Sequence, residues 1–201
     1  MKNKNQAEKY FNQKNFSTLE IILLAVTVVA FFAATFIRGG GPVGTPIGLV
    51  GIVVLVICRS YKIRDTAMDR HLEAILIEHQ VARGDATLEG YDLNQALLKK
   101  RKDGKVISPV YYVTNVVFTS AETVFHVYVA DLIEASVSKD IYTVSGRGEL
   151  ELVEESVKTP AGLKKVSCVR IAGCDKSIPV DLTNYQSSQL MEKICDRHAA
   201  K

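Results

Sequence analysis

The stretch FIRGGGPVGTPIGLVG (Phe36–Gly51) lies between two apolar runs and contains six glycines and two prolines. Such a segment can cradle a phosphate, or it can reverse the chain outside a membrane. A phosphate-binding loop needs the pattern G-x-x-x-x-G-K-[ST], and no lysine follows any of these glycines. The segment also fails as a dinucleotide-binding fingerprint, because it lacks the preceding strand and the later acidic residue that this motif requires. The segment therefore predicts a tight turn, residues 38–46, between two membrane helices.

The two apolar runs beside this turn predict a transmembrane helical hairpin over residues 17–61. The first run, Ser17–Ile37, has about 21 residues and would span about 30 Å, the thickness of a hydrocarbon core. Its only charge is Glu20, which has the capping-box spacing from Ser17. The second run is shorter and richer in glycine, so a re-entrant or interfacial helix stays open as its alternative. We expect helices at about residues 17–37 and 43–60.

Basic residues flank both outer ends of the hairpin, whereas the turn carries only Arg38. The flanking residues are Lys2, Lys4, Lys9 and Lys14 before it and Arg59, Lys62, Arg64 and Arg70 after it. The positive-inside rule then places residues 1–16, as a basic tail, and the C-terminal domain in the cytoplasm. A cleaved signal peptide is the competing interpretation, but the apolar run is long for one. The predicted location is the cell (inner) membrane, with two spans.

Small residues recur at helical spacing in both apolar runs. Ala30 and Ala34 form one such step in the first run, and Gly44 and Gly48 form another in the second. These steps predict close helix packing within the hairpin or between copies of the chain. A homo-oligomeric channel or transporter subunit is therefore the alternative function, although only Thr27 and Thr35 add polar groups within the first run.

Residues 62–105 predict a helical connector that carries a basic cluster. The period of apolar residues favours an amphipathic helix from Lys62 to Arg83, and a shorter helical stretch is expected at Asn94–Lys100. The basic cluster that follows consists of Lys99, Lys100, Arg101, Lys102 and Lys105. It is either a solvated turn or a patch that contacts the anionic inner leaflet, where each basic residue contributes on the order of 1 kcal/mol.

Residues 106–201 predict an antiparallel β domain. About six or seven segments are rich in β-branched and aromatic residues, and TPAG (Thr159–Gly162) reads as a hairpin turn. A last helix at 184–198 places Leu190, Met191, Ile194 and Cys195 on one stripe. Strands and helices do not alternate, so we expect an α+β fold, namely an antiparallel sandwich or partly open barrel capped by the helix. An open antiparallel sheet with the helix on one side is the alternative.

Two segments of this domain carry a resemblance to a known family. YVTNVVF (Tyr112–Phe118) followed by VYVADLI (Val127–Ile133) resembles the bacterial PH-like and GRAM-like domains, over about Val106–Lys201. The sequence departs from their pattern at Val116 and Val117, where Lys-Arg is frequent. The resemblance implies a PH-like fold and a binding module rather than a catalyst, and it brings no universal site residues to this chain.

The remaining polar residues do not form a recognisable reactive set. The four cysteines include no C-x-x-C pair, and His71 and His79 accompany no zinc motif. We expect no catalytic residues, metal, cofactor or small-molecule substrate, and the net charge of +3 is too small to indicate nucleic acid. The sequence thus predicts a membrane-anchored accessory or scaffold protein that contacts a membrane-protein partner, itself or the inner leaflet. A membrane enzyme is a second alternative.

Overall fold

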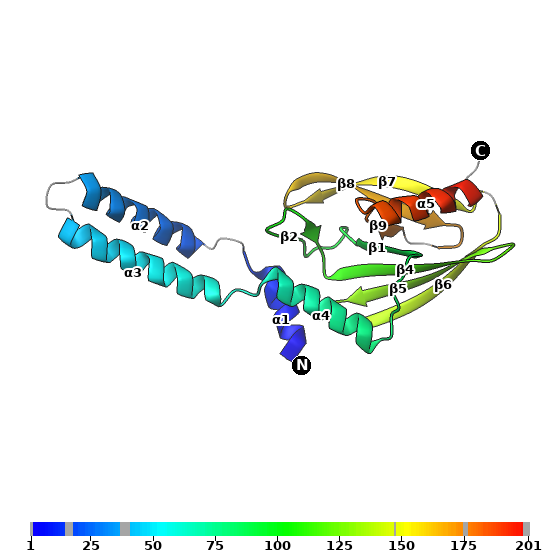
Figure 1. Ribbon diagram of the computed structural model, residues 1–201, viewed down its shortest axis with the longest axis horizontal. Coiled ribbons are helices and arrows are strands. Elements are labelled where there is room, and N and C mark those ends of the chain that lie inside the picture. The colour runs from blue at the N-terminus through cyan, green and yellow to red at the C-terminus, as the bar shows by residue number, and fades with distance from the viewer. Residues whose placement is uncertain (1, 15–17, 37–40, 147, 175–176, 199–201) are drawn as a thin grey trace. The chain divides into compact units, whose positions relative to one another are not determined.

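The computed structural model describes residues 2–14, 18–36, 41–146, 148–174 and 177–198, and it does not describe the side chains of residues 2–5, 34–35 and 41–45. The chain divides into two compact units. The helical unit is Asn12–Arg64, and the β unit combines Met1–Phe11 with Asp65–Lys201. Figure 1 shows the helices of the first unit and the antiparallel sheets of the second. The expected α+β class, with antiparallel sheets and a C-terminal helix, is confirmed.

Two apolar helices, α2 (Thr18–Phe36) and α3 (Gly41–Ser60), pack side by side in the helical unit (Figure 1). Ala30 and Gly48 are buried there, and a Cβ atom added to Gly48 would lie 2.8 Å from the Phe31 ring. The side chains of Ala34 and Gly44 lie outside the described set. Of the two predicted small-residue steps, the structure therefore describes one member each, and both are at helix contacts.

The lengths of the apolar helices support one of the two predicted membrane spans. By length and composition, one described helical stretch, which begins at Pro46 and includes most of α3, is apolar and long enough to cross a membrane. The described apolar part of α2, Thr18–Ala33, does not meet that length, and the second span stays a prediction. The second apolar helix also begins earlier than the predicted residue 43. The helix α3 already begins at Gly41, because proline is tolerated in a first helical turn and Pro42 falls there.

The two ends of the helical unit are tied to each other. The Lys62 Nζ atom lies 2.6 Å from a Glu20 carboxylate oxygen. The side chain of Gln13 exchanges two hydrogen bonds with the backbone of Ile63, at 2.7 and 3.0 Å. Ser17, the expected capping partner of Glu20, lies outside the described residues. The chain therefore enters and leaves the helix pair through segments that are joined by side chains.

The β unit contains a four-stranded and a three-stranded antiparallel sheet. The first sheet has the order β1 (Thr87–Tyr91), β4 (Val110–Phe118), β5 (Thr123–Asp131) and β6 (Ser136–Val144), and the second has the order β7 (Leu150–Thr159), β8 (Gly162–Ile171) and β9 (Ile178–Val180). The short strands β2 (Lys99–Lys100) and β3 (Val106–Ile107) form a separate pair. The predicted turn at TPAG is confirmed, since Thr159 pairs with Gly162 at the end of the β7–β8 hairpin.

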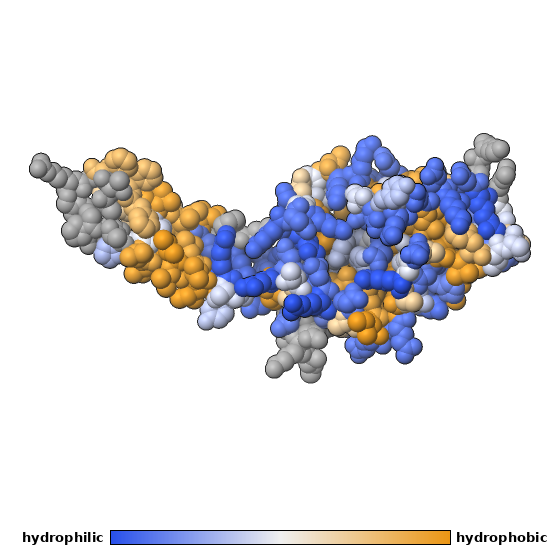
Figure 2. Space-filling view, in the orientation of Figure 1, coloured by the Kyte–Doolittle hydropathy of each residue, from blue (hydrophilic) through white to orange (hydrophobic). Residues whose placement is uncertain are grey.

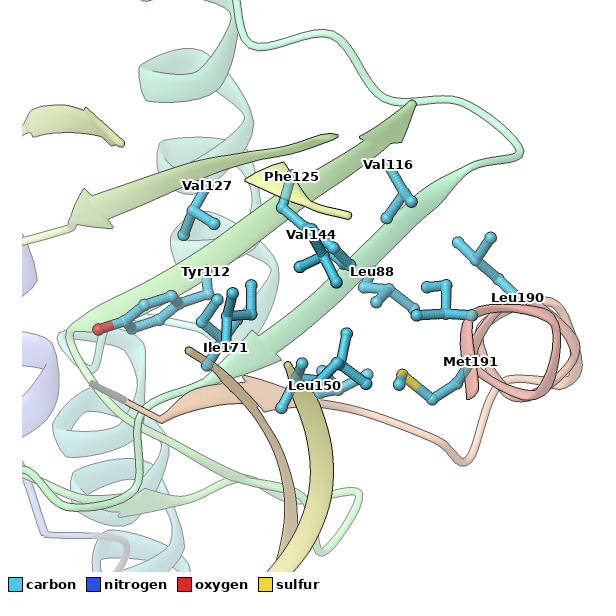
Figure 3. Packing of buried hydrophobic residues seen from close by; sticks show 14 residues of the cluster. Leu88, Tyr112, Val116, Phe125, Val127, Val144, Leu150, Ile171, Leu190 and Met191 are labelled. Carbon is cyan, nitrogen blue, oxygen red and sulfur yellow. The ribbon is translucent and has the colours of Figure 1, made fainter. Parts of the chain in front are cut away.

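One hydrophobic core joins both sheets to the last helix, α5 (Tyr185–His198). Leu190 and Met191 extend from α5 toward the side chains of the sheets (Figure 3). The cluster comprises Leu88, Tyr112, Val116, Phe125, Val127, Val144, Leu150, Val169, Ile171, Ile178, Val180, Leu190, Met191 and Ile194. The predicted stripe on the last helix is confirmed for its first three members, and Cys195 packs at the edge of the core.

The β unit begins earlier in the chain than predicted. The strand β1 lies inside the segment assigned to a helical connector, and all five of its residues pair with β4. The predicted helix Lys62–Arg83 is shorter, α4 (Asp65–Glu78). The stretch Asn94–Lys100 is not helical, because Asp92 accepts hydrogen bonds from Asn94 and Gln95 and turns the chain into β2.

The first residues of the chain form a helix, α1 (Lys2–Asn12), rather than a basic tail. Its Ala7, Tyr10 and Phe11 side chains are buried, and they follow the i, i+3, i+4 spacing of one helix face. The lysines of this segment occupy positions other than these three. The charge of the segment therefore suggested a solvated tail and concealed its apolar face. Residues up to Phe11 belong to the β unit.

Candidate binding surfaces

The basic cluster of residues 99–105 does not form a single exposed patch. Lys99 is only 5% exposed, and its Nζ atom donates a hydrogen bond to the Tyr10 carbonyl oxygen at 2.6 Å. The same Nζ atom lies 4.3 Å from the centre of the Tyr10 ring. A lysine held in this way stabilises the attachment of α1 and is not available to a lipid headgroup.

Arg101 is the centre of an ion-pair network at the same place. Its guanidinium group donates two hydrogen bonds to the Asp69 carboxylate, at 2.6 and 2.9 Å, and lies 3.5 Å from Asp103. The hydrogen bond to Asp69 raises the pKa of Arg101, so the group stays charged. Tyr10 donates to Asp65 at 2.9 Å, and burial followed by this bond raises the pKa of its hydroxyl. The network thus joins α1, α4 and the β2–β3 pair.

The other three members of the cluster differ in their surroundings. Lys105 lies 2.9 Å from Asp181, which follows β9. Lys100 and Lys102 are exposed. At least three of the five predicted membrane-contact residues therefore have partners inside the β unit, and contact with a membrane stays a prediction for this cluster.

Replacing Lys99 with methionine is expected to loosen α1, because the Tyr10 carbonyl oxygen loses a charged donor in a buried place. The expected loss is about 2 kcal/mol in the free energy that holds the helix in place. Hydrogen exchange of the α1 amides, measured by mass spectrometry on the full chain, would report it as faster exchange. The matched control is Lys102→Met, at an exposed position. Equal exchange in the two variants would contradict this role of Lys99.

A groove opens between β1, the end of β9 and the first half of β8. Its cavity volume is about 290 Å³. A second cavity of about 240 Å³ shares Gly90, Tyr91, Lys105, Asp181 and Thr183 with the first. The Lys105–Asp181 ion pair is therefore common to the walls of both cavities.

The groove exists because β9 leaves β8 early. Among the described residues, only Ser167, Cys168 and Val169 of β8 pair with β9. The Asp181 amide then donates to the Glu89 carbonyl oxygen of β1 at 2.7 Å, so the chain crosses to the other sheet. The close approach of β1 to β9 also needs Gly90, since a Cβ atom there would overlap the Pro179 carbonyl oxygen. The divergence of the two strands leaves the space beside residues 164–167.

Lysines dominate the charge around the groove. Lys105, Lys164 and Lys165 line it together with one acid, Asp181. Burial alone would raise the pKa of Asp181, but hydrogen bonds from Thr183 and Lys105 lower it, so this carboxylate stays charged. Burial raises the pKa of the Tyr91 hydroxyl to about 12, which keeps it a neutral donor. Among these residues the sequence indicated only Lys105, because the others come from segments whose proximity depends on the fold.

The described residues contain no group of three or more His, Cys, Asp or Glu side chains that could hold a metal ion. His71 contacts the Leu132 carbonyl oxygen at 2.8 Å, and His198 lies 2.6 Å from the Thr123 hydroxyl. His71 thus holds α4 against the turn that follows β5, and His198 holds α5 against the first residue of β5. These contacts give both histidines a structural role.

Cys168 is expected to resist alkylation in the folded protein. Its side chain is 4% exposed, and burial raises the pKa of the thiol to about 11. At pH 8 its thiolate fraction is then about 0.001, so reaction with iodoacetamide should be at least roughly 100-fold slower than after denaturation. Peptide mass spectrometry of the native and denatured chain measures this ratio, and similar labelling in both would contradict the burial of Cys168.

The groove and the network around Lys99 are thus two different surfaces of the β unit. The first is open, lined by lysines and apolar side chains, and suited to binding. The second is closed by internal hydrogen bonds and ion pairs. Comparisons with known proteins add no family assignment: no family model matches the sequence, and neither a curated protein nor a solved structure matches it significantly.

Proposed function

We propose that this chain is a membrane-anchored binding module. The α2–α3 pair is its anchor, and the β unit is a PH-like domain that binds a protein partner. The observation that carries the proposal is the contrast between the two units. One exposes apolar side chains along both of its helices, and the other gathers a large cluster of buried apolar side chains between its sheets and α5.

The surface of the helical unit supports anchoring. Val29 is 66% exposed and Val53 is 56% exposed, and similar exposure recurs along both helices. Figure 2 shows apolar residues over the visible face of this unit. Exposed apolar surface is unfavourable in water at about 25 cal/mol per Å², so a continuous apolar surface of this kind requires a cover. A lipid bilayer covers such helices without any specific partner.

The strand arrangement supports the PH-like part of the proposal. Four strands in one sheet and three in the next are followed by a single helix that packs on both. The motif Tyr112–Phe118 lies in β4, and the motif Val127–Ile133 begins in the paired strand β5. The two motifs in successive strands and the single last helix fit what the resemblance implies.

A protein partner fits the β unit better than the anionic leaflet does. Lys99, Arg101 and Lys105 already bind groups of the β unit, so the basic cluster offers a membrane surface less charge than its sequence suggests. The groove at β8 offers an open backbone edge beside apolar side chains. We place this domain on the cytoplasmic side, from the basic residues that flank the helices.

Expression of the full chain in bacterial cells tests the two halves of the proposal. The chain should stay in the membrane fraction after alkaline carbonate extraction, and in-cell crosslinking should recover a partner protein in a fixed ratio. Val29→Asp together with Val53→Asp should release it, because each acid at a helix centre costs about 3 kcal/mol on insertion. Thr143→Asp, on an exposed position of β6, is the control. Release of the unaltered chain by carbonate would overturn the anchor, and crosslinks only between copies would overturn the partner-protein role.

A further inference from the structure

The strand β8 has a free edge along its first half. β7 pairs with β8 over all ten residues, from Leu150–Ile171 to Thr159–Gly162. β9 pairs with only three residues of β8, so in the described part of the chain no strand covers the outer edge of residues 162–166. An unpaired edge of this length is a ready template for a further strand.

The space beside this edge can accept a side chain. The cavity of about 290 Å³ lies along residues 164–167 of β8. Its apolar lining includes Leu93, Val106 and Val166, which belong to a small hydrophobic cluster of the β unit. A strand added to β8 could therefore bury an apolar side chain in the groove while its backbone pairs with the edge.

The charges around the groove select an acidic occupant. Lys105, Lys164 and Lys165 line it, and Asp181 is its one acid. The ion pairs of Lys105 with Asp181 and of Lys165 with Glu154, both 2.9 Å, involve partly exposed side chains. Such pairs contribute little in water, so a carboxylate of a ligand can replace or share them. Lys164 is exposed and adds a further positive charge.

We propose that this groove binds an extended acidic segment of the partner protein, which adds to the free edge of β8 as a further strand. Main-chain hydrogen bonds to residues 162–166 hold the segment. Side chains alternate between the two faces of β8, so Lys164 and Val166 share one face and Lys165 lies on the other. On the first face an apolar side chain of the segment lies over Leu93 and Val106, and a neighbouring carboxylate contacts Lys164 and Lys105. On the other face a carboxylate contacts Lys165. This inference rests on the proposed function, since it takes the β unit as a domain that binds a protein.

The test uses the full chain in lipid nanodiscs and a fluorescent seven-residue peptide with one central valine between two runs of three glutamates. Fluorescence anisotropy should show binding that weakens as salt increases. A peptide with lysine in place of glutamate should not bind. The same acidic peptide, N-methylated on the amides that would face β8, should bind at least tenfold more weakly, because it cannot donate to a strand edge. Equal binding of the methylated peptide, or no binding of the acidic peptide, would overturn strand addition.

A pair of variants assigns the binding to the groove. Lys164→Glu should weaken the acidic peptide at least tenfold, whereas Lys139→Glu, an equal charge change on the exposed part of β6, should leave its affinity within twofold. Unchanged affinity in Lys164→Glu would overturn the groove as the site. These outcomes distinguish failure of this inference from failure of the proposed function. A chain that resists carbonate and crosslinks to a partner, but does not bind the peptide, keeps its proposed role and loses only this inference.

Discussion

Replacing Gly90 with alanine is expected to lower the free energy of unfolding of the β unit by about 3 kcal/mol. A Cβ atom at this position would overlap the Pro179 carbonyl oxygen and lie 3.0 Å from the Val180 amide nitrogen. Both are backbone atoms, so no side-chain rotation removes the clash. The strands β1 and β9 must separate, and this also strains the hydrogen bond from the Asp181 amide to the Glu89 carbonyl oxygen. Urea unfolding of the full chain, followed by near-ultraviolet circular dichroism of its tyrosines, measures the loss.

Gly84 provides the matched control for this prediction. A Cβ atom at Gly84 would meet no atom within 4 Å, so Gly84→Ala should change the free energy of unfolding by less than about 1 kcal/mol. Similar losses in the two variants would mean that chain flexibility, rather than the close approach of β1 and β9, sets the effect. Gly90 also lines both cavities, so the same substitution should weaken binding in the groove.

The sequence predicted the elements that carry their own local pattern. An abundance of β-branched and aromatic residues identified β4 and β5, turn residues identified the β7–β8 hairpin, and a helical stripe identified α5. The strand β1 was missed because Thr87–Tyr91 is short and contains a glycine, features that argue against a strand when taken alone. Only its pairing with β4 and its approach to β9 explain it, and both are long-range contacts.

The sequence identified the basic cluster at residues 99–105 but did not show which of its side chains are exposed. Lys99 and Lys102 look equivalent in the sequence, yet Lys99 is buried against Tyr10 and Lys102 is exposed. The difference arises because α1 covers one of them, and the first residues were assigned to a tail. The groove was missed for a different reason, because its lining comes mainly from β1, β8, β9 and the segment after β9, which only the fold brings together.

Replacing Ile194 with alanine is expected to lower the free energy of unfolding of the β unit by about 3 to 4 kcal/mol. The Ile194 side chain is fully buried in the core cluster, which contains residues of α5 and of both sheets. Alanine favours helix more than isoleucine does, so α5 itself should not be weakened by the change. The loss would therefore come from the missing side-chain volume in the core. The same urea unfolding measurement on the full chain reports it.

Glu192→Ala, at an exposed position of α5, is the control and should change the free energy of unfolding by less than about 0.5 kcal/mol. The comparison tests whether α5 is an integral layer of the domain or a helix that lies loosely on one sheet. In the second case the Ile194 variant would lose little stability, and both sheets would keep their slow hydrogen exchange. If α5 is integral, the loss should instead accelerate exchange in β5 and β8 together, because Phe125 and Val169 belong to the same cluster. A domain unified in this way holds the free edge of β8 and the β1–β9 approach in one rigid frame, which is what a preformed binding groove requires.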